Sequence, residues 1–216
     1  DWFMYDFSRV YVPVSGRLTP RRWLKQLATG HSYITNGPFL EFRVNGEAIG
    51  STLKLSEPGR LRVTARAVGR SDFGRIELIS NGGVLAHAAT RAVGGHHEAT
   101  LDTTVEIRSP GWLALRTPPP SVSGDASRSR KTPLNALGRE LFAHTSPIYV
   151  TLDGKTIFDV AVATEMLATM KKHVAAIREN GKFLDDAARA RVLDVHFAAI
   201  AAFEKRLATE TRDRSR

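Results

Sequence analysis

The sequence predicts an α+β fold, with a short strand–helix–strand piece, an antiparallel β-sandwich and a C-terminal helical hairpin in that order. Three patterns indicate this. Apolar and polar residues alternate across residues 39–116, which is typical of half-buried strands. Apolar residues recur every three or four positions across residues 160–207, which is typical of packed helices. Residues 9–35 place a strand pattern on each side of a helix start.

The N-terminal piece begins with an expected strand at residues 9–14. Thr19 and Pro20 then mark a helix start, because a hydroxyl side chain caps the first turn and proline fits the first helical position. A second strand is expected at residues 33–35. A βαβ-like unit of this kind cannot cover its own sheet. We therefore interpret residues 1–37 as the end of a larger α/β layer, in a chain that is the C-terminal part of a longer protein.

Residues 38–156 are predicted to form the β-sandwich. The turn sequences Asn45-Gly46 and Asn81-Gly82-Gly83 lie between alternating strands, so each indicates a β-hairpin. Residues 117–139 contain a proline triplet and a run rich in Ser, Arg and Gly, which we interpret as a mobile loop. Residues 141–152 return to a strand pattern and are expected to rejoin the sandwich.

Residues 157–208 are predicted to form the helical hairpin. Asn180-Gly181 separates two helices, and the acidic residues 185–186 suit the positive N-terminal end of the second. The seams expected to face each other are Leu167, Met170 and Val174 on the first helix and Leu193, Ile200 and Phe203 on the second. Residues 209–216 are expected to be a disordered tail.

The composition is that of an ordinary globular protein, with 42% hydrophobic and 25% charged residues among 216. The formal charge of +9 would suit a nucleic-acid partner, but the basic residues are spread over strands, a loop and the last helix, so we expect no such partner. No apolar run reaches the roughly 20 residues needed to span a bilayer. The absence of cysteine excludes disulfides and thiolate metal sites and leaves the compartment open.

One motif stands out. Residues 30–38 read Gly-His-Ser-Tyr-Ile-Thr-Asn-Gly-Pro and lead into an apolar alternating strand. This motif resembles the barrel-to-sandwich junction of CehA/McbA-type metallohydrolases of the PHP (polymerase and histidinol phosphatase) superfamily. Residues 142–150, and the helical hairpin with its Gly181-Lys182-Phe183 break, are similar to later parts of that family.

The resemblance implies a metal-dependent hydrolase. Members of the family cleave amide, carbamate or ester-type bonds of small-molecule substrates with metal-activated water. The resemblance also implies that residues 1–37 are the C-terminal remnant of a PHP-type barrel, whose N-terminal half lies outside this sequence and holds the zinc, iron or manganese. We therefore expect this chain to lack the metal site and to be catalytically silent alone.

His31, Asn36 and His144 are the candidate residues that we expect nearest to the missing metals. His31 stands where the family more often carries Arg, and its structural alternative is a strand-end histidine bonded to the backbone. His144 has a similar alternative, in which it fixes the chain after the loop. His96 and His97 follow two glycines and are interpreted as an exposed turn. No three metal ligands converge in the sequence.

Two other functions remain open at this point. The first is a non-enzymatic β-sandwich recognition module that binds a sugar or a protein. The second, which the charge distribution favours least, is a basic nucleic-acid-binding domain. Coding sequence upstream of Asp1 would separate them, because His-x-His and Asp or Glu motifs there would favour the hydrolase.

Overall fold

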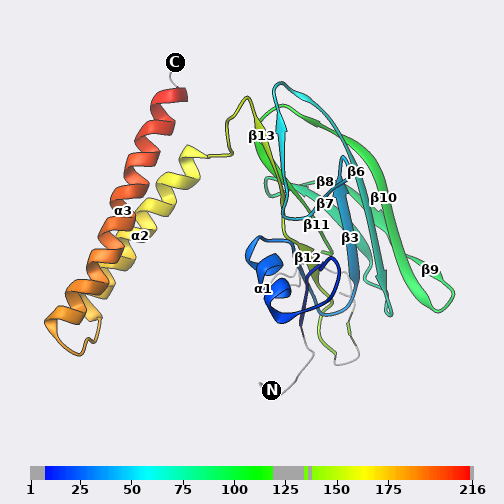
Figure 1. The fold of residues 1–216 in the computed structure, drawn as a ribbon, viewed down its shortest axis with the longest axis horizontal. Coiled ribbons are helices and arrows are strands. Elements are labelled where there is room, and N and C mark those ends of the chain that lie inside the picture. Colours follow the sequence, from blue (N-terminus) through cyan, green and yellow to red (C-terminus); the bar gives the residue numbers. More distant parts are fainter. Residues whose placement is uncertain (1–7, 119–133, 136–137, 215–216) are drawn as a thin grey trace, which may run out of the picture. The chain divides into compact units, whose positions relative to one another are not determined.

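The computed structural model describes residues 8–118, 134–135 and 138–214. The chain divides into two compact units, Asp1–Ile157 and Phe158–Arg216. In the described residues, the first unit contains two β-sheets and one helix, and the second contains two helices (Figure 1). Most of the predicted mobile loop, residues 119–133 and 136–137, lies outside the described residues.

Sheet A, within the described part of the chain, has eight strands. Their order is β1 (Arg9–Tyr11), β2 (Tyr33–Thr35), β12 (Ala143–Thr145), β11 (Gly111–Arg116), β13 (Ile148–Leu152) and β5 (Thr52–Leu55), with β7 (Arg75–Ser80) on β11 and β8 (Gly83–Ala89) on β7. The β13–β5 pair is parallel and the other pairs are antiparallel. The predicted strand at 141–152 is therefore confirmed as part of the sandwich, although residues 146–147 interrupt it and divide it into β12 and β13, which both pair with β11.

Sheet B is antiparallel and is made of five strands in the described residues. Their order is β4 (Glu47–Ala48), β3 (Phe39–Val44), β6 (Gly59–Gly69), β10 (His96–Ile107) and β9 (Arg91–Val93). The predicted hairpin turn between β3 and β4 is confirmed, because Asn45 and Gly46 both have positive φ. The turn predicted at His96-His97 is wrong. Gly94 and Gly95 complete the turn with positive φ, so that both histidines begin β10.

The core lies between the two sheets. Every second residue of β6 is buried from Leu61 onward, and the same alternation places Leu113 and Leu115 of β11 inward. These buried side chains and the inward residues of β3 and β13 belong to one hydrophobic cluster. The period-two pattern of the sequence therefore predicted the inward face correctly, because alternate residues of a strand point to opposite faces.

The expected βαβ-like unit at residues 9–35 is wrong. β1 runs antiparallel to β2, with Arg9 opposite Thr35 and Tyr11 opposite Tyr33. Two parallel strands need a crossover that carries the chain back to the end of the sheet where the first strand began. The segment that contains α1 (Pro20–Ala28) instead starts β2 at the end of the sheet where β1 finished. β2 also pairs with β12, so this segment is continuous with sheet A of the sandwich and does not form a separate α/β layer.

The second unit is an antiparallel pair of helices, α2 (Val160–Asn180) and α3 (Asp186–Arg214). Asp159 accepts hydrogen bonds from the first-turn amides of α2, and Asp185 accepts one from the Ala188 amide of α3. The predicted seams are confirmed at their centres, where Val174 and Ile200 are buried. The described helices include none that is long and apolar enough to cross a membrane.

The disordered tail predicted at residues 209–216 is wrong for its described part, because α3 continues to Arg214. Leu207 and Glu210 extend the half-buried seam by one more turn. The Arg206 and Glu210 side chains also form an ion pair at i and i+4, 3.9 Å apart, which supports the last turns of a helix.

Candidate functional site

A groove on the outer face of sheet A is the candidate site that contains one of the predicted residues, His144. Strand alternation builds it. The side chains of Leu113, Leu115 and Ile148 point into the core, so those between them point outward. The groove has a volume of about 480 Å³. Its lining residues are Ile79, Trp112, Ala114, Leu115, Arg116, His144, Thr145, Pro147, Tyr149 and Ile157.

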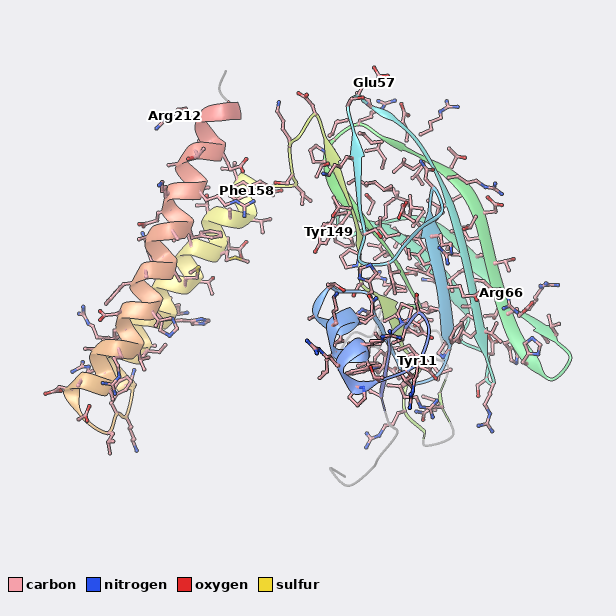
Figure 2. All side chains as sticks on the ribbon, in the orientation of Figure 1. Tyr11, Glu57, Arg66, Tyr149, Phe158 and Arg212 are labelled. Atoms are coloured by element: carbon pink, nitrogen blue, oxygen red, sulfur yellow. The ribbon has the colours of Figure 1, made fainter. Side chains whose placement is uncertain are left out.

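Two cross-strand pairs form the ends of the groove. Trp112 of β11 lies directly opposite Tyr149 of β13, and Arg116 of β11 lies directly opposite His144 of β12. The small side chain of Ala114 lies between the two pairs on β11. Tyr149 is 45% exposed at the surface of sheet A (Figure 2). The groove therefore has an aromatic end and a basic end.

A buried carboxylate fixes the basic end. Glu77 of β7 is only 3% exposed, and its Oε1 accepts hydrogen bonds from Nε and Nη2 of Arg75 at 2.8 and 2.5 Å. Its Oε2 accepts one from Nε of Arg116 at 3.0 Å. Burial alone would raise the pKa of Glu77, but the bonds from Arg75 and Arg116 outweigh it and hold the pKa below its usual value. Two guanidinium groups and one carboxylate leave a net charge of +1.

Asn36 occupies the turn between β2 and β3 and thus joins the two sheets. Its Nδ2 donates to the Glu140 carbonyl oxygen and its Oδ1 accepts from the Phe142 amide, both at 2.8 Å. Thr35 completes the turn, because its hydroxyl donates to the Pro38 carbonyl at 2.7 Å and accepts from the Gly37 amide at 2.9 Å. Both polar ends of the Asn36 side chain are thus used to hold backbone, which gives it a positioning role in the fold.

His31 lies two residues before β2, at the opposite end of that strand from Asn36. Its Nδ1 is 2.9 Å from the Thr29 hydroxyl, at the end of α1. Within the described residues, no hydrogen bond or ion pair joins any two of His31, Asn36 and His144. The structure therefore places these three candidates along the β2–β12 ladder without bringing them into one site.

The metal that the family resemblance implies would need several convergent His, Asp or Glu side chains. No group of three or more His, Asp or Glu side chains that could hold an ion occurs in the part of the chain that the structure describes. The described residues therefore do not fit a zinc, iron or manganese centre.

A second cavity of about 510 Å³ is lined by residues of β3 and by Tyr11 and Tyr33. These two tyrosines lie opposite each other on β1 and β2 of sheet A. The two tyrosine rings stack at 4.9 Å, and Phe39 meets both rings edge-on. Burial raises the pKa of the Tyr33 phenol, and a contact with the Leu40 backbone only partly offsets this rise. The Tyr33 hydroxyl is buried and makes no hydrogen bond of normal geometry within the described residues.

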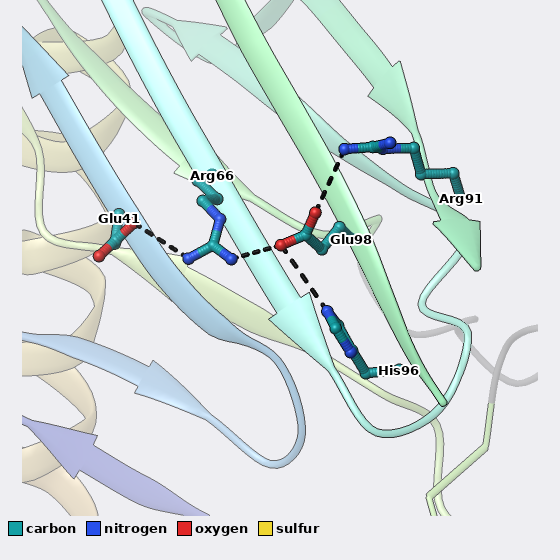
Figure 3. A network of polar contacts seen from close by, with 5 residues as sticks. All are labelled: Glu41, Arg66, Arg91, His96 and Glu98. Atoms are coloured by element: carbon teal, nitrogen blue, oxygen red, sulfur yellow. Dashed lines mark hydrogen bonds and ion pairs between the residues drawn. The ribbon is translucent and has the colours of Figure 1, made fainter. Parts of the chain in front are cut away.

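A network of charged side chains crosses the outer face of sheet B from β3 to β9 (Figure 3), and its members Glu41 and Arg66 also line this cavity. Arg66 forms ion pairs with Glu98 and, at 3.8 Å, with Glu41. Oε2 of Glu98 lies 3.3 Å from Nη2 of Arg91, and its Oε1 lies 3.7 Å from Nε2 of His96. The Glu98 side chain is 11% exposed. The hydrogen bond from Arg66 lowers the pKa of Glu98. The acidic partners on this face neutralise several of the basic residues that raise the formal charge.

Sequence reasoning missed the groove and the Glu77 cluster. Glu77 stands between two apolar residues, so alternation predicts an exposed position for it. The signal that could have found the groove is the placement of aromatic residues at outward positions of two strands, Trp112 and Tyr149. Comparisons with protein-family models, curated proteins and solved structures find no match for this chain.

Proposed function

We propose that this chain is the C-terminal part of a metal-dependent hydrolase that cleaves amide, carbamate or ester-type bonds, with its metal ligands on residues outside the chain. The motif at residues 30–38 supports this proposal through its resemblance to the PHP-superfamily junction. The observation that carries it is the bonding of that motif. Thr35 and Asn36 fix the turn that leads from β2 of sheet A into β3 of sheet B.

The residues of this chain would then position the metal-bearing part and recognise the substrate. They would not cleave the bond themselves. Asn36 and Thr35 would hold the junction against the metal-bearing part. The groove with His144 and Arg116 would offer an apolar surface and a positive charge to a substrate. The zinc, iron or manganese of the whole enzyme would supply the activated water, and that chemistry would be independent of the residues described.

The experiment uses the longer protein that the proposal requires, purified and assayed on carbamate, amide and ester substrates. It is expected to bind metal and to hydrolyse at least one of these classes. In that protein, Asn36→Ala should lower stability with little change in KM. His144→Ala should change KM with little change in stability, because His144 is exposed. A longer protein that is metal-free and inactive would contradict the proposal.

A second function is favoured by the groove itself, a non-enzymatic recognition module in which the sandwich binds a ligand and no reaction follows. An apolar groove of several hundred Å³ with a few convergent polar groups is the usual form of a small-molecule site. The two proposals differ in the assay above. Ligand binding by the groove in a longer protein without hydrolytic activity would favour recognition alone.

A further inference from the structure

We propose that the groove on sheet A binds a small organic anion, a planar or aromatic ring that carries a carboxylate. The ring would lie against Trp112 and Tyr149, and the carboxylate would bind Arg116 and His144. This site does not depend on the hydrolase proposal, because it is derived from the groove alone.

The aromatic end sets the first requirement on the ligand. Trp112 and Tyr149 are directly opposite on adjacent antiparallel strands, where side chains are close enough to act as one surface. Ala114 carries only a methyl group, so it leaves space above the sheet between this surface and Arg116. Flat apolar rings gain most from such a surface, because aromatic faces pack against them and bury apolar area. Ile79, which is buried, forms part of the floor.

The basic end sets the second requirement. Arg116 uses Nε to bind Glu77, and within the described residues its terminal Nη nitrogens make no hydrogen bond. Its side chain is 33% exposed and lines the groove, and the bond from Nε to Glu77 holds the guanidinium in place. A guanidinium positioned in this way pairs well with a planar carboxylate, which can accept two parallel hydrogen bonds. The ring nitrogens of His144, directly opposite on β12, add a further donor.

The charge balance favours an anion over a cation or a neutral ligand. Among the residues that the structure describes, none that lines the groove is Asp or Glu. The carboxylate that binds Arg116, Glu77, also binds Arg75, so these three groups leave one positive charge unmatched. An anionic ligand would neutralise that charge, whereas a cation would be repelled.

The test is a titration of the full chain with phenylacetate, which carries both features, and with phenylacetamide, its uncharged analogue. Binding is followed by NMR of the aromatic side chains and by calorimetry. Phenylacetate is expected to bind, with phenylacetamide at least about tenfold weaker, because a charge-assisted pair is stronger than a neutral one. Equal affinity of the two compounds, or no binding of phenylacetate, would overturn the proposal.

Two variants and a control locate the site. Arg116→Gln and Tyr149→Ala should each weaken phenylacetate binding by about tenfold or more, and Tyr149→Ala changes an exposed side chain, so the fold is retained. Arg62→Gln is the matched control, because Arg62 pairs with Asp102 on the exposed face of sheet B. Unchanged affinity in Tyr149→Ala, or an equal loss in Arg62→Gln, would contradict the assignment.

Discussion

The Oδ1 atom of Asn36 accepts a hydrogen bond of 2.8 Å from the amide of Phe142, a residue 106 positions later in the chain. The same side chain donates to the carbonyl of Glu140. One short side chain therefore ties the crossing between the two sheets to the segment that enters β12. This contact links the motif at residues 30–38 to the segment at 142–150, the two segments of the sandwich on which the proposed family relationship rests.

Replacement of Asn36 tests that connection. Asn36→Ala should lower the free energy of unfolding by about 1–3 kcal/mol, because it removes the hydrogen bond from the Phe142 amide and the one to the Glu140 carbonyl. Asn36→Asp keeps the acceptor for the Phe142 amide but loses the donor to Glu140, so its loss should be smaller. Urea unfolding of the three proteins measures the differences. If Asn36→Asp lowers the free energy of unfolding as much as Asn36→Ala at neutral pH, the hydrogen bond from the Phe142 amide contributes little to stability.

The Glu77 cluster predicts a pH dependence of stability. The pKa of this carboxyl is held below its usual value of about 4.3 by Arg75 and Arg116. A lowered pKa means that the stabilisation is complete above the usual value and is lost as the pH falls through the folded-state value. Glu77→Gln should therefore be less stable than the wild type at pH 7, by about 1.5–3 kcal/mol, and the difference should shrink in acid.

Urea unfolding of wild type and Glu77→Gln between neutral and acidic pH measures this change. Glu57→Gln is the control, because Glu57 lies exposed in the loop between β5 and β6 (Figure 2). A difference between wild type and Glu77→Gln that stays constant down to the lowest pH would show that the ionised form of Glu77 contributes nothing.

Gly50 and Gly46 allow a matched test of close packing. Both have positive φ, at +82° and +84°. A Cβ at Gly50 would lie 2.6 Å from the carbonyl oxygen of Gly30, whereas a Cβ at Gly46 would have nothing within 4 Å. Gly46→Ala should cost about 1–2 kcal/mol from backbone strain alone. Gly50→Ala should cost clearly more, and equal melting temperatures of the two variants would contradict the close contact of residues 30 and 50.

The helical unit predicts different effects for two apolar residues of α3. Ile200 is 9% exposed in the seam with α2, and Val195 is 70% exposed. Ile200→Ala should lower the stability of the helices by about 2–5 kcal/mol, because it leaves a cavity. Val195→Ala should change it little. Thermal unfolding followed by circular dichroism at the helical signal measures both. Comparable losses would mean that the outer face of α3 is also packed in solution.

The helix start, the hairpin turn and the buried face of β6 could be predicted because each depends on residues that are close together in the sequence. Thr19 caps α1 and accepts a hydrogen bond from the Arg22 amide, as its sequence position indicated. The Asn45-Gly46 turn adopts the conformation that its residues favour. Alternation along β6 indicated which side chains are buried, because the strand is long enough for the period to be clear.

Pairing between distant strands could not be predicted in the same way. β1 and β2 have three residues each, so their sequences do not determine a parallel or antiparallel pairing. The burial of Glu77 depends on Arg116, 39 positions later, which meets it only when β7 and β11 align. The groove could not be predicted for the same reason, because Trp112 and Tyr149 become neighbours only through the register of β11 and β13.

The most direct test of the central claim, that this chain supplies the metal-free part of a hydrolase, is its own metal content. The chain is purified, exposed in turn to zinc, iron and manganese, passed over a chelating resin and analysed for bound metal, and the same samples are assayed on carbamate, amide and ester substrates. No stoichiometric metal and no hydrolysis above the uncatalysed rate are expected. A tightly bound metal in a one-to-one ratio, with hydrolysis that a chelator abolishes, would contradict it.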